Sequence, residues 1–315
     1  MNAIPTLNDI QEAAKRISVA ANYTPILTSK LIDEFCGCKI FFKCENFQKV
    51  GAFKFRGAYN TIASLSNEDL QKGVVTHSSG NHAAALTLAA KLNNTTAYIV
   101  MPRTAPEIKK RAVQSYGAKI TFCEPTLKSR EETAQKIIDE TGAYLVHPFN
   151  NYSIITGQAT AAYELINDSD KLDYILTPVG GGGLLSGTSL STNYLSPHTK
   201  VIGCEPDGAD DAFRSLRDGI IYPSENPKTI CDGLLTSLGE ITFKIISKYV
   251  DEIITVDDEK IIEAMRLVWE RMKIIIEPSS AVPLAVVMNN KSKFENKSVG
   301  IILTGGNVDL NKLPF

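Results

Sequence analysis

The chain has 315 residues, of which 43% are hydrophobic, and a formal net charge of -2, which gives no electrostatic case for nucleic-acid binding. No apolar run is long enough to span a bilayer, and the first residues lack the basic region and apolar core of a signal peptide, so we expect a cytoplasmic protein without membrane association. Six scattered cysteines fit neither a disulfide framework nor a zinc site, and they predict reduced, mostly buried thiols.

Hydrophobic patterns typical of strands and helices alternate along almost the whole chain. Strands are predicted at residues 39–44, 73–76, 97–101, 119–123, 144–146, 174–179, 201–205, 252–256 and 299–303. Helices are predicted at residues 83–92, 105–116, 130–140, 184–195, 257–272 and 281–289. This alternation indicates the α/β class, with two open, twisted, mostly parallel sheets flanked by helices and a cleft between them. We expect a large domain of residues 1–72 and 150–315 and a small domain of residues 73–149.

The first segment with chemical potential is residues 50–57, in which Lys54 stands between Phe53 and Phe55 with glycines on either side. An amine among aromatic rings is poorly solvated, which favours its neutral, nucleophilic form. A neutral lysine amine can condense with an aldehyde cofactor. The alternative is a lysine whose stem covers core aromatics while its charge stays in water.

The second segment, Thr-His-Ser-Ser-Gly-Asn-His at residues 76–82, follows a predicted strand and precedes a predicted helix. A helix that begins with small residues leaves backbone N–H groups free to bind an anion. Two hydroxyls, an amide and an imidazole would converge there, and a substrate carboxylate is a natural guest. The alternative is an ordinary turn with one serine as the N-cap.

In the third segment a predicted strand runs into four glycines, residues 180–183, and then into a helix. Four glycines allow the backbone to fold around a phosphate with its N–H groups pointing inward; the alternative is a flexible loop. Neither the dinucleotide fingerprint nor the Walker A pattern fits here, which argues against a dinucleotide-dependent oxidoreductase.

The fourth segment, Leu-Thr-Gly-Gly-Asn at residues 303–307, lies at the end of the last predicted strand. Its Thr304 could hydrogen-bond a pyridine nitrogen without fully protonating the ring, which would make that ring a weaker electron sink than an aspartate partner would. A plain turn is the alternative.

In this order the four segments resemble the fold-type II pyridoxal-phosphate enzymes, the tryptophan synthase β-like group. Within it the chain most resembles serine racemase and the serine/threonine dehydratases, over nearly its whole length. The most specific motifs are Gly-Ala-Phe-Lys-Phe-Arg-Gly, Ser-Ser-Gly-Asn-His, the four glycines, Val-Trp-Glu-Arg-Met-Lys at residues 268–273 and Gly-Gly-Asn-Val-Asp at residues 305–309. The resemblance implies a small-molecule amino-acid substrate and a homodimer.

The resemblance also implies roles for individual residues. Lys54 would hold the aldehyde of pyridoxal 5'-phosphate and then act as a base on one face of the substrate, with Ser79 as the acid and base on the other face. The implied cofactor-binding residues are Phe53, Lys54, Asn81, Gly180, Gly181, Gly182, Gly183, Gly233 and Thr304. The implied substrate-binding residues are Ser78, Ser79, Asn81, His82 and Arg130, the last of which could instead be a solvated helix charge.

A cation site for Mg²⁺, Ca²⁺ or Mn²⁺ is implied as well, formed by Glu205, the backbone carbonyl of Ala209, and Asp211. Carboxylate and carbonyl oxygens suit a hard cation; the alternative is a charged, water-filled turn.

The chain departs from the family at a nucleotide site known in animal serine racemase, and this argues against ATP as an effector. Three alanines at residues 83–85 stand where the family shows Gly-Gln-Ala, and Val50 and Lys30 replace a threonine and a serine. Other residues of that site remain, namely Lys49, Tyr116, Lys273 and Asn307. Residues 149–150, Phe-Asn, also differ from the Asn-Gln of the animal enzymes.

Together these features predict β-elimination of water, racemisation, or both, on a β-hydroxy amino acid. L-serine is the first candidate, and L-threo-3-hydroxyaspartate and threonine are the alternatives. Ser79 keeps both routes open, and Arg130 is the candidate partner for a second carboxylate. A non-catalytic binder of the cofactor or of amino acids is the alternative from another class, and Lys54, Ser79 and Thr304 argue against it. The chain ends soon after its last glycine motif, so no regulatory domain is expected.

Overall fold

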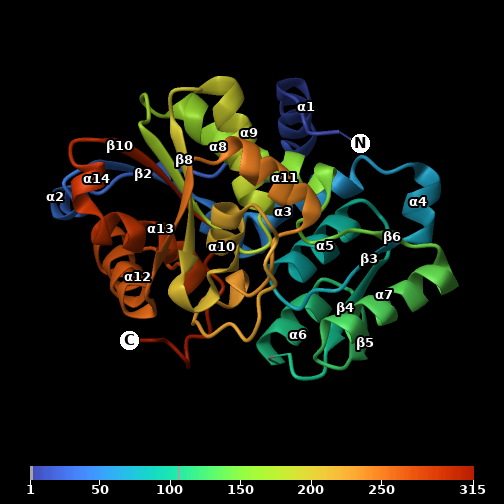
Figure 1. Cartoon of the computed structure of the whole chain (residues 1–315). Coiled ribbons are helices and arrows are strands. Elements are labelled where there is room, and N and C mark those ends of the chain that lie inside the picture. Colours follow the sequence, from blue (N-terminus) through green and yellow to red (C-terminus); the bar gives the residue numbers. More distant parts are fainter. Residues whose placement is uncertain (1–2, 106) are drawn as a thin grey trace.

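The computed structural model describes residues 3–105 and 107–315, which form two separate β-sheets covered by helices (Figure 1). The larger sheet has six strands in the order β1-β2-β10-β7-β8-β9. Strand β1 is antiparallel to β2, and all other neighbouring strands are parallel. The strands are β1 (Ile26–Leu27), β2 (Lys39–Cys44), β7 (Tyr174–Pro178), β8 (Lys200–Pro206), β9 (Glu252–Val256) and β10 (Ser298–Leu303).

The smaller sheet has four parallel strands in the order β5-β4-β3-β6. They are β3 (Val74–Thr76), β4 (Ala97–Pro102), β5 (Lys119–Cys123) and β6 (Tyr144–Leu145). Helix α5 (Asn81–Leu92) packs on one face of this sheet and α7 (Leu127–Thr141) on the other, while α6 (Glu107–Ser115) joins β4 to β5. In Figure 1 this sheet and its helices lie to the right of the larger sheet.

Helices cover both faces of the larger sheet. On one face lie α2 (Lys30–Cys36), α12 (Asp258–Met272), α13 (Pro278–Asn289) and α14 (Lys291–Phe294). On the other lie α8 (Tyr152–Asp168), α9 (Gly183–Leu195), α10 (Asp211–Asp218) and α11 (Glu240–Tyr249), with α1 (Leu7–Ile17) packed outside α8. Helix α3 (Lys54–Ile62) contacts both α8 and α5, and therefore joins the two layered units; α4 (Asn67–Lys72) leads from it to β3.

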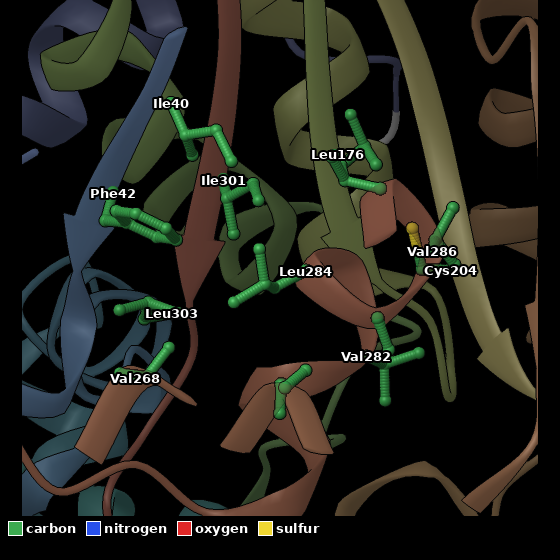
Figure 2. Packing of buried hydrophobic residues seen from close by; sticks show 14 of the residues in the cluster. Ile40, Phe42, Leu176, Cys204, Val268, Val282, Leu284, Val286, Ile301 and Leu303 are labelled. Carbon is green, nitrogen blue, oxygen red and sulfur yellow. The ribbon is translucent and has the colours of Figure 1, made fainter. Parts of the chain in front are cut away.

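The largest core lies between the larger sheet and helices α12 and α13. Figure 2 shows Phe42, Leu176 and Ile301 from three adjacent strands packed against Val282 and other side chains of α13. The central strands are buried on both faces and so are apolar along their length, as expected for a parallel sheet between helices. The carboxyl ends of these strands carry the polar segments of the candidate site.

The structure confirms every strand and helix predicted from the sequence, with ends shifted by at most three residues. The predicted helix at 105–116 includes residue 106, which lies outside the described residues.

The main element that the sequence patterns missed is α8. This helix is buried nearly all round, so it has no amphipathic period to detect. A Cβ added at Gly157 would lie 2.6 Å from the Cα of Gly57, so the lack of side chains at these two glycines lets α8 and α3 approach closely. The side chain of its N-cap, Asn151, accepts a hydrogen bond from the Ile154 N–H, and this cap was the available signal.

A buried ion network holds the start of α3. The Arg56 guanidinium donates to both carboxylate oxygens of Glu45, at 2.7 and 2.8 Å, and to both of Glu164, at 2.6 and 2.8 Å. Lys43 Nζ lies 2.6 Å from Glu164, so two cations balance two carboxylates. Burial alone would raise the pKa of Glu45, but the Arg56 charge reverses this and holds the pKa below its usual value. The network ties β2, α3 and α8 together two residues after Lys54.

Two compositional predictions can be compared with the structure. All six cysteines are free and buried, which confirms the expected reduced thiols. Among the helices of residues 3–105 and 107–315, none has both the length and the apolar character that a membrane span requires.

Candidate active site

Lys54 begins α3, directly after a loop that follows β2, and its side chain is half-buried. Its Nζ lies 5.0 Å from the centre of the Phe53 ring and donates a hydrogen bond of 3.2 Å to the Pro148 carbonyl. Burial lowers the pKa of Lys54 to about 8, against the opposing effect of the Glu277 carboxylate. The amine is therefore much closer to neutrality than an exposed lysine, as expected for a nucleophile.

Residues 146–149 connect β6 to α8 and pass beside Lys54. The Val146 carbonyl contacts His82 Nε2 at 3.3 Å, and the His147 ring meets the rings of His77 and Phe149 edge-on. Burial lowers the pKa of His147 to about 4, with further lowering from His77 and Lys54, and burial also lowers the pKa of His82. The imidazoles are therefore neutral at neutral pH, and Lys54 is the amine beside them whose pKa of about 8 lies near neutrality.

The second predicted segment is the loop between β3 and α5. Ser78 and Ser79 are half-buried in it, and α5 begins at Asn81, so the hydroxyls lie at a helix N-terminus as predicted. The Asn81 amide donates to both carboxylate oxygens of Glu277, at 3.0 and 3.1 Å, and its oxygen accepts from Asn307 at 2.9 Å. Burial raises the pKa of Glu277 to about 7. These contacts join the start of α5 to the larger sheet.

The four glycines connect β7 to α9 in a closely packed loop, most tightly at Gly181 and Gly182. A Cβ on Gly181 would lie 2.2 Å from the Phe149 ring, and one on Gly182, which has φ +83°, would lie 2.8 Å from Leu238. The loop is held by Thr242, whose hydroxyl donates to the Gly181 carbonyl at 2.8 Å. The N–H groups of the first turn of α9 lack helical partners, as at any helix start, so the loop can receive an anion.

Gly233 lies in the short 3₁₀ helix η4 (Asp232–Leu234), directly against this loop. A Cβ on Gly180 would be 3.1 Å from the Gly233 carbonyl oxygen and 3.1 Å from Leu234 Cα. The Gly233 N–H donates to the Ser279 hydroxyl at 3.3 Å. The structure thus brings together two glycine segments that are far apart in the sequence.

Thr304 follows β10 and is buried beside the segment that carries Lys54. Its carbonyl accepts from the Phe53 N–H at 2.9 Å, and its hydroxyl lies 2.9 Å from the hydroxyl of Ser280 in α13. Thr304 is therefore attached through its backbone to the residue that precedes Lys54.

Arg130 lies in α7, at the edge of this cluster, where its charge acts on the pKa of His77. Its Nε is buried and has no hydrogen-bond partner among the described residues. An unpaired guanidinium N–H is costly to bury, so this group fits an incoming anion better than it fits a solvated helix charge.

The residues proposed for a cation lie elsewhere, after β8. Glu205 accepts from the N–H groups of Ala212, at 3.0 Å, and Phe213, at 2.6 Å, and the 3₁₀ helix η3 (Asp207–Ala209) separates it from Asp211. Asp211 is 1% exposed, and neither carboxylate oxygen has a partner of ordinary hydrogen-bond geometry among the described residues. Burial raises the pKa of Glu205 to about 9, with a further rise from Asp211, and raises that of Asp211 to about 6.

Two neighbouring buried carboxylates, of which Asp211 has both oxygens without a partner, fit a hard cation. No group of three or more His, Cys, Asp or Glu side chains in the described part of the chain is arranged to hold a metal ion. A cation here would therefore need the Ala209 carbonyl and water as further ligands.

The structure thus gathers Phe53, Lys54, His82 and Asn81 in one cluster, with the glycine loop joined to it through Phe149. Sequence reasoning missed the roles of Glu277, His147 and Ser280, each of which contacts a predicted site residue or its neighbour. The available signal for His147 was its position at the carboxyl end of a predicted strand; Glu277 and Ser280 had none.

Comparisons with known proteins agree with this geometry. A family model described as pyridoxal-phosphate dependent enzyme matches residues 17–305. The chain is 50% identical to the beta-hydroxyaspartate dehydratase of Paracoccus denitrificans over 312 residues, covering 99% of each chain. It is 50% identical to the serine racemase of Dictyostelium discoideum over 315 residues, covering 99% of this chain and 97% of that one. The crystal structure of a serine racemase from the same organism superposes with a TM-score of 0.94 at 51% identity, over 98% of this chain and 100% of that one.

Proposed function

The chain belongs to the family of pyridoxal-phosphate dependent enzymes, and on this premise we propose that it removes water from a β-hydroxy amino acid and also interconverts its enantiomers, with L-serine as the first substrate. The observation that carries the proposal is the Lys54 amine, whose pKa is lowered to about 8 beside the Phe53 ring. The names of the two relatives support the substrate class.

The site fits pyridoxal phosphate in three respects. Lys54 offers an amine close to neutrality for the aldehyde, and Phe53 offers a ring beside that amine. Gly180, Gly181, Gly182 and Gly183 offer a closely packed loop at the start of α9, where the phosphate would lie, with Gly233 against it. Asn81 would meet the phenolic oxygen of the ring, and Thr304 would face the ring nitrogen. When bound, the cofactor supplies an electron sink for negative charge at the α-carbon.

The chain's own residues would supply the remaining chemistry. The neutral Lys54 amine would take the α-proton at Nζ. Ser78, Asn81 and His82 hold the substrate carboxylate at the start of α5, where backbone N–H groups favour an anion. The Ser79 hydroxyl gives or takes a proton at the opposite face of the α-carbon. Loss of the α-proton and the β-hydroxyl as water, followed by hydrolysis of the released enamine, would give a keto acid and ammonia, whereas proton delivery by Ser79 would give the other enantiomer.

The test compares wild type with Ser79→Ala, and with Ser247→Ala as a control at an exposed serine on α11. L-serine is supplied, keto acid is measured with a coupled dehydrogenase, and residual serine is analysed on a chiral column. Ser79→Ala should abolish D-serine formation and keep part of the dehydration of L-serine. Equal loss of both activities would contradict the two-face mechanism, and turnover of threonine alone would overturn the substrate assignment.

A second candidate substrate, L-threo-3-hydroxyaspartate, is favoured by Arg130. Its unpaired Nε suits a second carboxylate, and a relative at 50% identity carries the name beta-hydroxyaspartate dehydratase. A charge-assisted hydrogen bond of about 1.5–3 kcal/mol corresponds to about 10- to 100-fold in kcat/KM. Arg130→Met should cause that loss for hydroxyaspartate and little change for serine, with the exposed Arg103→Met as control. Equal loss for both substrates would exclude a role in the second carboxylate.

We further propose that Glu205, the Ala209 carbonyl and Asp211 hold Mg²⁺, or Ca²⁺ or Mn²⁺ in its place, and that the protein is a cytoplasmic homodimer. The orphaned oxygens of Asp211 support the cation. The departures from the family pattern at residues 83–85, Val50 and Lys30 support a lack of activation by ATP.

The two layered units, residues 1–72 with 150–315 and residues 73–149, are proposed as domains because each contains one of the two sheets. Light scattering, and assays with each cation and with ATP, test these points.

A further inference from the structure

His147 begins a turn that is closed by its own side chain. Its Nδ1 atom accepts a hydrogen bond of 2.9 Å from the Asn150 N–H and a longer one, of 3.3 Å, from the Phe149 N–H. These residues lie between β6 and α8, outside any helix or strand, so the regular ladders of the fold do not determine their course. The imidazole therefore fixes the shape of residues 147–150, which we call the His147 turn.

The two backbone partners determine where the proton of this imidazole lies. A backbone N–H can only donate, so the Nδ1 atom that receives two of them carries no proton, and Nε2 carries the proton of the neutral ring. Burial, with contributions from His77 and Lys54, lowers the pKa of His147 to about 4, which agrees with a ring that stays neutral. At neutral pH the side chain is thus an acceptor for its own backbone.

The middle of the His147 turn contacts the two parts of the site that would hold the ends of the cofactor. The Pro148 carbonyl accepts from Lys54 Nζ at 3.2 Å. The Phe149 ring lies against the glycine loop, where a Cβ on Gly181 would be only 2.2 Å from it. One turn of four residues therefore sets the position of the lysine amine relative to the glycine loop.

The last residue of the turn reaches the same loop by a second route. The side-chain oxygen of Asn150 accepts from the Ile241 N–H, at 2.9 Å, in the first turn of α11. In that same helical turn the Thr242 hydroxyl donates to the Gly181 carbonyl at 2.8 Å. The His147 turn therefore supports the glycine loop directly through Phe149 and indirectly through α11.

We propose that His147 is a positioning residue, which holds the Lys54 amine and the glycine loop at the separation that pyridoxal phosphate requires between its aldehyde and its phosphate. The inference rests on the proposed function, in which Lys54 meets the aldehyde and the glycine loop meets the phosphate. A turn that is folded beforehand does not have to be ordered when the cofactor binds, whereas a loose turn would subtract the cost of ordering from the affinity. His147 acts through Pro148 and Phe149.

An alternative role for His147 is packing by its ring alone, because that ring meets the rings of His77 and Phe149 edge-on. Two variants separate the ring from the acceptor. His147→Phe keeps an aromatic ring but offers no acceptor to the two N–H groups. His147→Asn removes the ring but keeps an acceptor, because asparagine side chains readily bond backbone N–H groups just ahead of them in the chain.

The experiment titrates each cofactor-free protein with pyridoxal phosphate, follows the absorbance of the bound cofactor, and maps the borohydride-reduced product to confirm attachment at Lys54. His147→Phe should raise the dissociation constant about tenfold or more, the size expected from one or two net hydrogen bonds, and His147→Asn should restore most of the affinity. Amide hydrogen exchange at Phe149 and Asn150 in the cofactor-free protein should be faster in His147→Phe and slow in His147→Asn. The control, His198→Phe, changes an exposed histidine between α9 and β8 and should alter neither quantity.

The pattern across the variants decides between the two roles. Weaker binding by His147→Asn than by His147→Phe, or equal losses in both, would show that the ring matters and would overturn the proposal. Wild-type affinity in His147→Phe, with the cofactor attached at Lys54, would also overturn it and would leave the proposed function intact. If the wild type itself does not attach the cofactor at Lys54, the proposed function fails and the inference fails with it.

Far-ultraviolet circular dichroism shows whether each variant folds. If His147→Phe does not fold, His147→Leu takes its place, because leucine and asparagine have similar size and shape and differ in the acceptor. His147→Leu should then bind pyridoxal phosphate about tenfold more weakly than His147→Asn, and equal affinities would contradict the positioning role.

Discussion

Replacement of Arg56 by methionine should be among the most destabilising single changes in this protein. The guanidinium is fully buried and makes four hydrogen bonds of 2.6–2.8 Å to the carboxylates of Glu45 and Glu164. Methionine fills much of the same volume but leaves two buried carboxylates with one cation, Lys43. Removal of one partner of a buried ion pair costs about 3–5 kcal/mol, mainly because the remaining charge is uncompensated. We expect Arg56→Met to lower the free energy of unfolding by that amount.

Urea unfolding of wild type and variant measures this loss, and Arg266→Met provides the control. Arg266 makes a contact of the same length, 2.7 Å, with Glu270, but on the surface of α12, where such a pair contributes about 0.3–0.5 kcal/mol. Combining Arg56→Met with Glu45→Gln should recover part of the loss, because one unpaired charge is then removed. A loss below about 1 kcal/mol for Arg56→Met would show that the two carboxylates are compensated in another way.

The pH dependence gives a second check on the same network. Because Arg56 holds the folded-state pKa of Glu45 below its usual value of 4.5, this carboxylate stabilises the wild type above about pH 4.5. That stabilisation is lost as the pH falls through the folded-state pKa. The difference in stability between wild type and Arg56→Met should therefore shrink as the pH falls below about 4.5. A difference that stays constant or grows would contradict the assigned direction of the shift.

Three further predictions concern the glycine loop, the lysine and the cation. Gly181→Ala places a methyl group 2.2–2.4 Å from the Phe149 ring, so it should lower the free energy of unfolding by about 1–3 kcal/mol and weaken the binding of pyridoxal phosphate. An unchanged affinity in a fluorescence titration would contradict this. The rate at which cofactor-free protein condenses with pyridoxal phosphate should rise about tenfold per pH unit and level off above about pH 8, whereas a continued rise would indicate an unperturbed Lys54. Mg²⁺ at about 100 times its dissociation constant should stabilise the wild type by about 2.7 kcal/mol, and Asp211→Asn by much less. Thermal unfolding with and without Mg²⁺ measures this, and no effect on the wild type would exclude the cation site.

Segments with a periodic pattern were predictable because the spacing of their apolar residues shows which face is buried. Strand β2 was predicted with its observed ends because it is a short run rich in residues that favour strands, Ile40, Phe41 and Phe42. Helix α12 alternates apolar and charged residues at helical spacing, so its pattern indicates a helix with one buried face. Helix α8 lacks that alternation because it is enclosed by α1, α3 and α9, and its threonines and glycine have low helix propensity. Tertiary packing, rather than local preference, keeps it helical.

The residues of the candidate site were likewise predictable only where neighbours in the sequence form a recognisable segment. The segments around Lys54, Ser79 and the four glycines were recognisable because each carries its chemistry in adjacent residues. Glu277 became visible only in the structure, because it meets Asn81 across 196 residues of chain. Phe149 likewise lies against Gly181 only because α8 and α9 pack together. A sequence pattern identifies the residue types at a site, whereas their protonation and orientation depend on neighbours brought there by the fold.

The hydroxyl of Thr304 shows most directly why residue type alone is not enough to assign a chemical role. Its oxygen lies 2.9 Å from the hydroxyl of Ser280, which is 24 residues away in the chain, and either hydroxyl can be the donor. The segment at residues 303–307 gives no sign of this neighbour, so the hydrogen-bonding role of Thr304 depends on the fold. Dehydration and racemisation both begin with removal of the α-proton and diverge at the next step, where the β-hydroxyl leaves or a proton returns. Their ratio should therefore depend on whether Ser79 can deliver that proton.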